Sequence, residues 1–288
     1  MAAFTFQSVI KIAGQTLHAW YILPLGVYRR NQQKLLEQPS GFAPDITSRY
    51  AFKLLRDDPE AQLVIYLHGT AGTIRSGRRP DRYRALYSGA PDKIHVVTLD
   101  CRGYGLSSGT PSEEGLPIDA ISLVKWATEV VNIPPSRIVI FAQSLGTAVA
   151  ISTSLHFASE SPPVSFADRI AEFVKRSEND IGVEKYNITF IHAKDDTDIP
   201  CFHTEGVFWH AINATFPTGI NYEDLGREKE LKKKDLAAGG WAVEWQTKRG
   251  VIREEIVRYR LHDKIMAYPV VSMAVLRAFQ SVDPASGS

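Results

Sequence analysis

The sequence has 288 residues, of which 44% are hydrophobic, so it can bury the core of one large domain or of two smaller ones. It carries 33 Lys and Arg against 32 Asp and Glu, and the formal charge of +1 argues against nucleic acid as a partner. Two cysteines cannot form a disulfide framework, which fits a reducing compartment. The sequence has neither a secretory signal nor an apolar run near 18 residues, so we expect a cytoplasmic protein with at most peripheral membrane contact.

The first 60 residues predict a β-hairpin and a long connection. Phe4–Ile12 and Leu17–Leu23 are rich in β-forming residues and flank a short turn that contains glycine, so the hairpin is expected over residues 4–23. The polar stretch that follows is expected to carry a short helix near Arg29–Glu37.

From residue 61 onward, short apolar runs alternate with helical segments. The runs have the length and the continuous hydrophobicity of buried parallel strands. This alternation predicts an α/β fold, with a mostly parallel sheet and helices on both of its faces. The predicted strands are Leu63–Leu67, Ile94–Leu99 and Arg137–Ala142, and the predicted helices are Pro80–Ser88, Ile118–Val131 and Leu145–Phe157.

The alternation is interrupted after residue 158. Residues 159–186 contain one amphipathic helix, Phe166–Arg176, and no segment with the character of a strand, so the sheet is expected to lack one strand here. We expect residues 1–288 to form a single domain with its core at 61–280 and a frayed tail at 283–288. The remaining predicted elements are the strands Asn187–His192, Trp241–Trp245 and Val251–Tyr259, the helices Thr204–Thr215 and Val270–Gln280, and a solvated helix face at Arg227–Asp235.

A serine between small residues follows the third predicted strand. The segment Ala142-Gln143-Ser144-Leu145-Gly146 lies between a β-branched strand and a helix. This context is typical of a nucleophile elbow, whose sharp turn leaves little room two positions before and two positions after the serine. Ser144 is therefore the predicted nucleophile.

A loop with two glycines, His-Gly-Thr-Ala-Gly-Thr at residues 68–73, follows the first central strand. Hydrolases of this architecture place here the loop that completes the oxyanion hole, where two backbone N–H groups stabilise negative charge on a carbonyl oxygen. The predicted donors are the N–H groups of Thr70 and Leu145. Taken by itself, the loop is also compatible with an ordinary glycine turn.

Three aspartates, Asp195, Asp196 and Asp198, follow the strand that ends at residue 192. A carboxylate at the end of a strand can accept the N–H group of a catalytic histidine, fix its tautomer and stabilise the imidazolium. A metal site that also uses His192 and His203 is the rival interpretation. The segment lacks the glycine and the terminal glutamate of a calcium loop, and no zinc spacing is present.

His262 is the best-placed general base. It follows the last β segment and precedes the final helix, so we expect it on a loop at the edge of the sheet. The chain order serine, acid, histidine is the order found in α/β-hydrolases, and it differs from the orders of the two well-known protease folds.

Three blocks of sequence together resemble the α/β-hydrolase superfamily. They read LVIYLHGTAG at 63–72, DCRGYGLSSGTPS at 100–112 and AQSLGT at 142–147, and the similarity spans roughly residues 17–280. Within the superfamily, the chain most resembles the lipid-directed branch of monoacylglycerol and lysophosphatidylserine lipases, which broad profiles group with serine aminopeptidases. The resemblance implies a serine hydrolase that cleaves a small-molecule or lipid ester through an acyl-enzyme and requires no cofactor or metal.

Matched to the family motifs, Ser144 is the nucleophile, Asp196 is the acid of the pattern His-x-x-x-Asp-x-x-Ile-Pro, and His262 is the base. Asp195 is the alternative acid. The family usually has Gly-x-His or Gly-Gly-His where residues 259–262 read Tyr-Arg-Leu-His. Ser144 and Asp196 are only 52 positions apart, so the strand and the lid segment that follow the nucleophile helix in relatives are expected to be missing.

Other functions fit part of the sequence. A chain that kept these motifs but lost activity with the missing strand would be a binding module, whereas a peptidase or a thioesterase of the same fold would use the same residues. Residues 103–109 also resemble a dinucleotide-binding loop, but their glycine spacing is off by one and Pro111 stands where a helix should begin. Ester hydrolysis accounts for the largest number of motifs.

Overall fold

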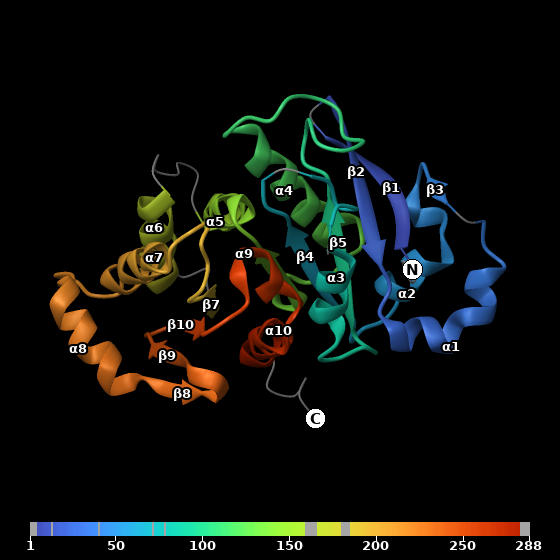
Figure 1. Ribbon diagram of the computed structural model, residues 1–288. Helices are drawn as coiled ribbons and strands as arrows, with labels where there is room; N and C mark the ends of the chain where they lie inside the picture. The colour runs from blue at the N-terminus through green and yellow to red at the C-terminus, as the bar shows by residue number, and fades with distance from the viewer. Residues whose placement is uncertain are drawn as a thin grey trace. The chain divides into compact units, whose positions relative to one another are not determined.

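The computed structural model describes residues 5–12, 14–39, 41–70, 72–77, 79–158, 166–179 and 185–282. The chain divides into two compact units, Met1–Thr153 together with Val275–Ser288, and Ser154–Ala274 (Figure 1). The tail expected at 283–288 lies outside the described residues. Each unit has a β-sheet of its own.

The sheet of the first unit has six strands in the order β3-β1-β2-β5-β4-β6. Strands β4, β5 and β6 are parallel, whereas β1 and β2 form an antiparallel hairpin whose second strand is also antiparallel to β5. The short strand β3 is parallel to β1. The strands are β1 (Thr5–Ile12), β2 (Gln15–Ile22), β3 (Phe42–Ala43), β4 (Gln62–Leu67), β5 (Ile94–Leu99) and β6 (Ile138–Ala142).

Helices cover both faces of this sheet. Alternate residues of the central strand β4 point to opposite faces, so its side chains pack against helices on both sides. Leu63 and Ile65 belong to the core that β4 shares with α1, α2 and α4. On the other face, Tyr66 packs edge-on against Tyr83 of α3. The helices are α1 (Leu25–Leu36), α2 (Tyr50–Arg56), α3 (Arg79–Tyr87), α4 (Gly115–Lys125), which a π-helical turn extends to Val130, and α5 (Leu145–Ala158), which continues into the second unit.

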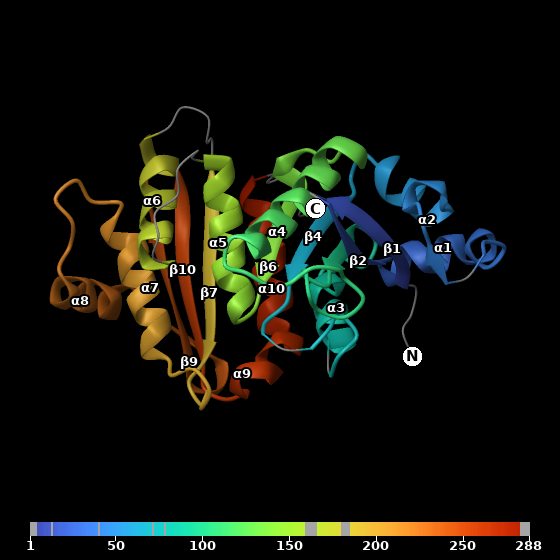
Figure 2. The same ribbon diagram turned by 90° about the horizontal axis from the view of Figure 1, so that it is seen from above.

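The sheet of the second unit has four strands in the order β7-β10-β9-β8. Strand β7 is parallel to β10, and β9 is antiparallel to both of its neighbours. Helix α7 packs against α6 and against both parallel strands, as Figure 2 shows, and α8 packs against β9. The elements are α6 (Phe166–Asn179), β7 (Tyr186–Ala193), α7 (Phe202–Asn213), α8 (Tyr222–Lys232), β8 (Lys234–Leu236), β9 (Gly240–Gln246), β10 (Gly250–Val257), α9 (Leu261–Lys264) and α10 (Pro269–Val282), which ends in the first unit.

The structure confirms the α/β alternation and the interruption after α5. Between α5 and β7, the described residues form the helix α6 and no strand. As a result, β6 and β7 are edge strands of two different sheets. The sequence did not predict α2, or the start of α8 at Tyr222. No helix in the described ranges has both the length and the apolar character needed to cross a membrane.

The edge position of β6 predicts a difference in amide hydrogen exchange. All six residues of β4, which pairs on both sides, are buried, whereas β6 pairs only with β4 among the described strands and its five residues are all partly exposed. Backbone N–H groups that point away from an unpaired edge exchange readily, because they have no hydrogen bond to a neighbouring strand that must open first. We expect the slowest exchange of the first unit in β4, and fast exchange at alternate residues of β6. Uniformly slow exchange along β6, measured by NMR, would show that another strand covers this edge.

Candidate active site

Ser144 lies at the sharp turn between β6 and α5. Its φ angle is 52°, in the left-handed region that residues with a side chain seldom adopt. A Cβ atom added to Gly146 would lie 2.3 Å from the carbonyl oxygen of Leu67, so no larger residue fits there without displacing the backbone. The turn therefore has the strained geometry and the close packing of a nucleophile elbow.

A buried polar network holds Gln143, the residue before Ser144. Its side-chain oxygen accepts hydrogen bonds from the Tyr66 hydroxyl, at 3.2 Å, and from the Arg82 guanidinium. Arg82 also donates to the Tyr66 hydroxyl at 3.3 Å, and all three residues are buried. Hydrogen bonds are what make a buried guanidinium tolerable. The network ties the elbow to β4 and α3, and sequence reasoning did not find it.

The loop after β4 passes directly beside Ser144. A Cβ atom added to Gly69 would lie 2.9 Å from the Cβ atom of Ser144. The backbone N–H groups of Thr70 and Leu145 donate no hydrogen bond to other described residues. For Leu145 the reason is its place at the start of α5, where helical N–H groups have no acceptor within the helix. Free N–H groups beside the serine are what an oxyanion hole requires.

Two buried charged residues hold the far end of this loop. An oxygen of the Asp100 carboxylate accepts the backbone N–H of Ile74 at 2.7 Å. The Arg79 guanidinium donates to the carbonyl oxygen of Thr73. Both side chains are buried, so these bonds are sheltered from competing water. Burial lowers the pKa of His68 at the start of the loop, which favours its neutral form.

Asp196 and His262 form a hydrogen-bonded pair in the second unit. The Nδ1 atom of His262 lies 2.8 Å from one oxygen of the Asp196 carboxylate. The other oxygen accepts the backbone N–H groups of Asp198 and Ile199, each at 2.9 Å. Burial alone would raise the pKa of Asp196, but these hydrogen bonds and His262 outweigh it and lower the pKa. The carboxylate is therefore ionised and accepts the Nδ1 proton, which leaves Nε2 of His262 as the basic atom.

Asp195, the alternative acid, binds the backbone that leads to His262. Its two oxygens accept the N–H groups of Arg260, at 3.1 Å, and Leu261, at 2.8 Å. Both of these residues have a positive φ, 137° and 51°, a conformation that favours glycine. Here the sequence departs from the glycines of the family pattern, and Asp195 stabilises the strained backbone that results.

His192 also belongs to the structure around Asp196. Its Nε2 atom donates to the carbonyl oxygen of Ile199 at 2.9 Å, and its Nδ1 atom accepts from the Thr204 hydroxyl at 2.6 Å. Both ring nitrogens are thus used in holding the segment that carries Asp196. No three His, Cys, Asp or Glu side chains in the described part of the chain converge as metal ligands do.

The predicted site residues are divided between the two units. Ser144, Thr70 and Leu145 lie in the first unit, and Asp196 and His262 in the second. The prediction that His262 lies on a loop is wrong, because the residue lies in the short helix α9. The left-handed residues just before it reverse the chain so sharply that a helical turn begins at once.

Arg260→Gly is expected to raise the free energy of unfolding by about 1 kcal/mol. A non-glycine residue at this φ costs roughly 1–3 kcal/mol, which exceeds the entropy that glycine adds to the unfolded chain. The contact of the Arg260 guanidinium with the Tyr268 ring, 4.0 Å from its centroid, offsets part of the gain. Urea unfolding measures the change, and the control Arg258→Gly, where φ is not positive, should be destabilising. An equal loss of stability in both variants would show that the backbone at Arg260 is not strained.

The chain resembles known lipases in sequence. It is 29% identical over 222 residues to the lysophosphatidylserine lipase ABHD12 of Danio rerio, which covers 65% of this chain and 53% of that protein. Over 102 residues it is 39% identical to the Bos taurus protein of the same name, which covers 35% of this chain and 24% of that protein. The chain thus spans about half the length of the first relative and about a quarter of the second. No protein-family model matches the chain.

Solved esterase structures share the fold. Est1E of Butyrivibrio proteoclasticus, solved with ferulic acid, has a TM-score of 0.55 at 11% identity, over 95% of this chain and 98% of that one. The Pyrococcus furiosus esterase Pf2001 has a TM-score of 0.54 at 12% identity, over 96% of this chain and 89% of that one. The chain therefore has the fold of these esterases, an α/β-hydrolase fold, and part of its sequence is similar to lysophosphatidylserine lipases.

Proposed function

We propose that the chain is a serine hydrolase that cleaves a lipid-like carboxylic ester through an acyl-enzyme. The observation that carries the proposal is the hydrogen bond of 2.8 Å between His262 and the ionised Asp196. This bond prepares Nε2 of His262 to act as a base. The strained turn at Ser144, together with the N–H groups of Thr70 and Leu145 that donate to no other described residue, supports the proposal from the other unit.

In the proposed reaction, Oγ of Ser144 attacks the ester carbonyl carbon while Nε2 of His262 takes the hydroxyl proton. The N–H groups of Thr70 and Leu145 stabilise the negative charge on the carbonyl oxygen. When the C–O bond to the alcohol breaks, His262 returns the proton to the leaving alcohol. Water then attacks the acyl-enzyme with the same base, which releases the carboxylic acid and restores Ser144.

The relatives support an ester with a fatty acyl chain as the substrate class. The relative of Danio rerio is named a lysophosphatidylserine lipase. A lysophospholipid or a monoacylglycerol is an ester with a fatty acyl chain and fits that support. A peptidase or a thioesterase would use the same residues on an amide or a thioester.

A binding module without catalytic activity is the second candidate, and the absence of a strand between α5 and β7 in the described residues favours it. A series of p-nitrophenyl esters from acetyl to long acyl, together with a serine-reactive phosphonate, separates the two candidates. We expect turnover that rises with acyl length, and labelling by the phosphonate. A binding module would show neither. A thioesterase or a peptidase would be labelled but would hydrolyse acyl thioesters or peptide anilides faster than esters.

A further inference from the structure

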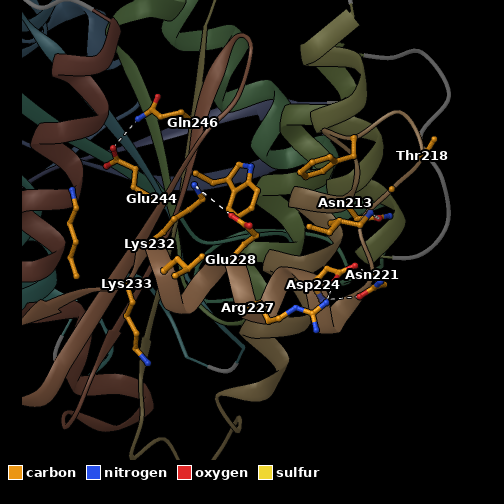
Figure 3. A pocket seen from close by; sticks show the side chains of 16 residues that line it. Asn213, Thr218, Asn221, Asp224, Arg227, Glu228, Lys232, Lys233, Glu244 and Gln246 are labelled. Atoms are coloured by element: carbon orange, nitrogen blue, oxygen red, sulfur yellow. Dashed lines mark hydrogen bonds and ion pairs between the residues drawn. The ribbon is translucent and has the colours of Figure 1, made fainter.

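A cavity of about 1250 Å³ lies between α8 and the strand β9 of the second unit. Figure 3 shows Glu244 and Gln246 of β9 on one side of it, and Asp224 and Arg227 of α8 on the other. None of the residues that line it takes part in the proposed acyl transfer. Small-molecule pockets usually measure about 300–1000 Å³, so this cavity has room for a larger ligand, such as a segment of peptide.

The strand β9 has an open edge in this cavity. On one side β10 pairs with it over residues 241–246, whereas on the other side β8 pairs only with residues 240–242. Since β8 is the last strand of the sheet, the described residues supply no other strand on that side. Residues 243–246 are therefore unpaired along this edge, and the last three of them line the cavity.

The backbone groups of Glu244 and Gln246 point toward the open edge. Alternate residues of an antiparallel strand direct their N–H and C=O groups to the same neighbouring strand. The N–H group of Thr247 donates to the carbonyl oxygen of Gly250 at 2.9 Å, so Trp245, two positions earlier, also pairs with β10. Glu244 and Gln246 alternate with these residues and present both groups to the other side, where no described group binds them. Four backbone groups are thus free to bind an added strand.

An apolar wall accompanies one face of this edge. The buried ring of Trp245 meets the ring of Phe216 edge-on, with centroids 6.1 Å apart, and both residues line the cavity. Leu231 of α8 lines it as well and is 81% exposed, the highest fraction among the large hydrophobic side chains of the described residues. Residues directly opposite each other in a sheet have neighbouring side chains, so a residue opposite Trp245 would lie on this apolar side.

One cation at the cavity has no partner. Most of the charged side chains that line the cavity form ion pairs with one another or with close neighbours. These pairs are Arg227 with Asp224, Lys232 with Glu228, Lys233 with Glu230 and Arg253 with Glu244. Lys234 also lines the cavity, is exposed, and forms no ion pair with a carboxylate of the described residues. The cavity therefore favours a peptide that is largely neutral and carries one negative charge beside Lys234.

The position of Lys234 sets the direction of an added strand. Lys234 is the first residue of β8 and lies opposite Ala242, where the open edge of β9 begins. A strand that runs antiparallel to β9 along this edge approaches Lys234 with its carboxyl end. A parallel strand would approach with its amino end, whose ammonium would be repelled by the consecutive lysines 232–234. A terminal carboxylate, which is both the end of the strand and an anion, matches this place.

We propose that the cavity binds the carboxyl-terminal segment of a partner protein as a short strand antiparallel to β9. The last residue of the segment lies opposite Glu244. Its N–H group donates to the Glu244 carbonyl oxygen, and its carboxylate accepts the Glu244 N–H group and pairs with Lys234. The penultimate residue is apolar and lies opposite Trp245, and the residue before it binds the backbone of Gln246. Main-chain hydrogen bonds give such added strands their affinity, and the pocket for the apolar side chain gives specificity. The proposal does not rest on the proposed hydrolase activity.

Calorimetric titration of the full chain with the peptide acetyl-Thr-Val-Thr-Phe-Val, which has a free carboxyl end, tests this arrangement. Methylation of the last peptide nitrogen should weaken binding at least about tenfold, because it removes a hydrogen bond and inserts a methyl group between the strands. Methylation of the penultimate nitrogen, which points away from β9, should leave the affinity unchanged. The same peptide with a carboxyl-terminal amide should bind at least about tenfold more weakly, since charge-assisted hydrogen bonds are the stronger ones.

Exposed residues of the cavity supply the variants of the chain. Lys234→Gln should weaken binding of the free-acid peptide about fivefold and leave binding of the amide peptide unchanged. Leu231→Ser should weaken binding of both peptides, because it removes part of the apolar wall. Both side chains are exposed, so neither change endangers the fold. The matched control is Lys125→Gln, an exposed lysine of α4 that does not line the cavity, and it should bind both peptides as the unmodified chain does.

Three results would overturn the proposal. The first is a folded chain that does not bind the free-acid peptide at millimolar concentration. The second is equal affinity for the two methylated peptides, because strand addition requires that only one of them bind well. The third is a dimer, seen by analytical ultracentrifugation, in which exchange at Glu244 and Gln246 is slow without peptide, because a second copy of the chain would then cover the edge. We expect a monomer in which these two amides exchange fast until the peptide is added.

Discussion

Ser144→Ala is expected to lower kcat/KM for ester hydrolysis by at least about a thousandfold and to abolish labelling by a serine-reactive phosphonate. The covalent route disappears with the hydroxyl, while the N–H groups at Thr70 and Leu145 remain and support slow background catalysis. The elbow should stay folded, because its packing depends on Gly146 and on the network around Gln143, and not on the serine hydroxyl.

A matched control is Ser122→Ala on α4, whose hydroxyl donates only to the carbonyl oxygen of Ile118 in its own helix. It should retain the activity of the unmodified chain. Turnover of the Ser144→Ala variant at the level of this control would remove Ser144 from the mechanism.

Asp196→Asn is expected to lower kcat/KM by up to about ten-thousandfold, less than the loss of the serine. The amide can no longer accept the Nδ1 proton of His262 as an ionised group, so the imidazole is free to adopt the wrong tautomer and its cation is not stabilised. The two backbone N–H groups now held by Asp196 can still bind the amide oxygen, so the segment itself should fold.

Asp195→Asn supplies the matched comparison for Asp196→Asn, since the two residues are neighbours of the same chemical type. We expect a loss of about tenfold or less, because Asp195 binds the backbone at residues 260 and 261 and does not touch the imidazole. If Asp195→Asn were the more damaging change, Asp195 would be the acid. Steady-state kinetics on one p-nitrophenyl ester, with circular dichroism of each variant, decides between them.

Local sequence patterns were sufficient to predict most of the fold. Nearly continuous apolar runs identified β4, β5 and β6, because strands buried between two layers of helices are apolar at most positions. The absence of such a run identified the gap between α5 and β7. The start of α8 was missed because its first turn, Tyr222-Glu-Asp, is polar and exposed, and its side-chain cap Asn221 precedes a segment without a clear apolar stripe.

The candidate site was predictable only in part. Ser144, Asp196 and His262 lie in short motifs at the ends of strands, where chain order is informative. The roles of Arg82 and Asp195 were not predictable, because Arg82 meets Gln143 across 61 positions and Asp195 meets Leu261 across 66. Contacts between residues this distant in sequence leave no local pattern. In each of the two contacts, one residue holds the backbone or side chain next to a proposed catalytic residue.

Reaction of the full chain with a fluorophosphonate, followed by proteolysis and mass spectrometry, tests the central claim most directly. The account predicts a single phosphonylated site at Ser144, and a sharply lower rate of labelling in the Asp196→Asn variant, because the attacking oxygen must lose its proton to His262. Labelling at another serine, or no labelling of a chain that circular dichroism shows to be folded, would contradict it.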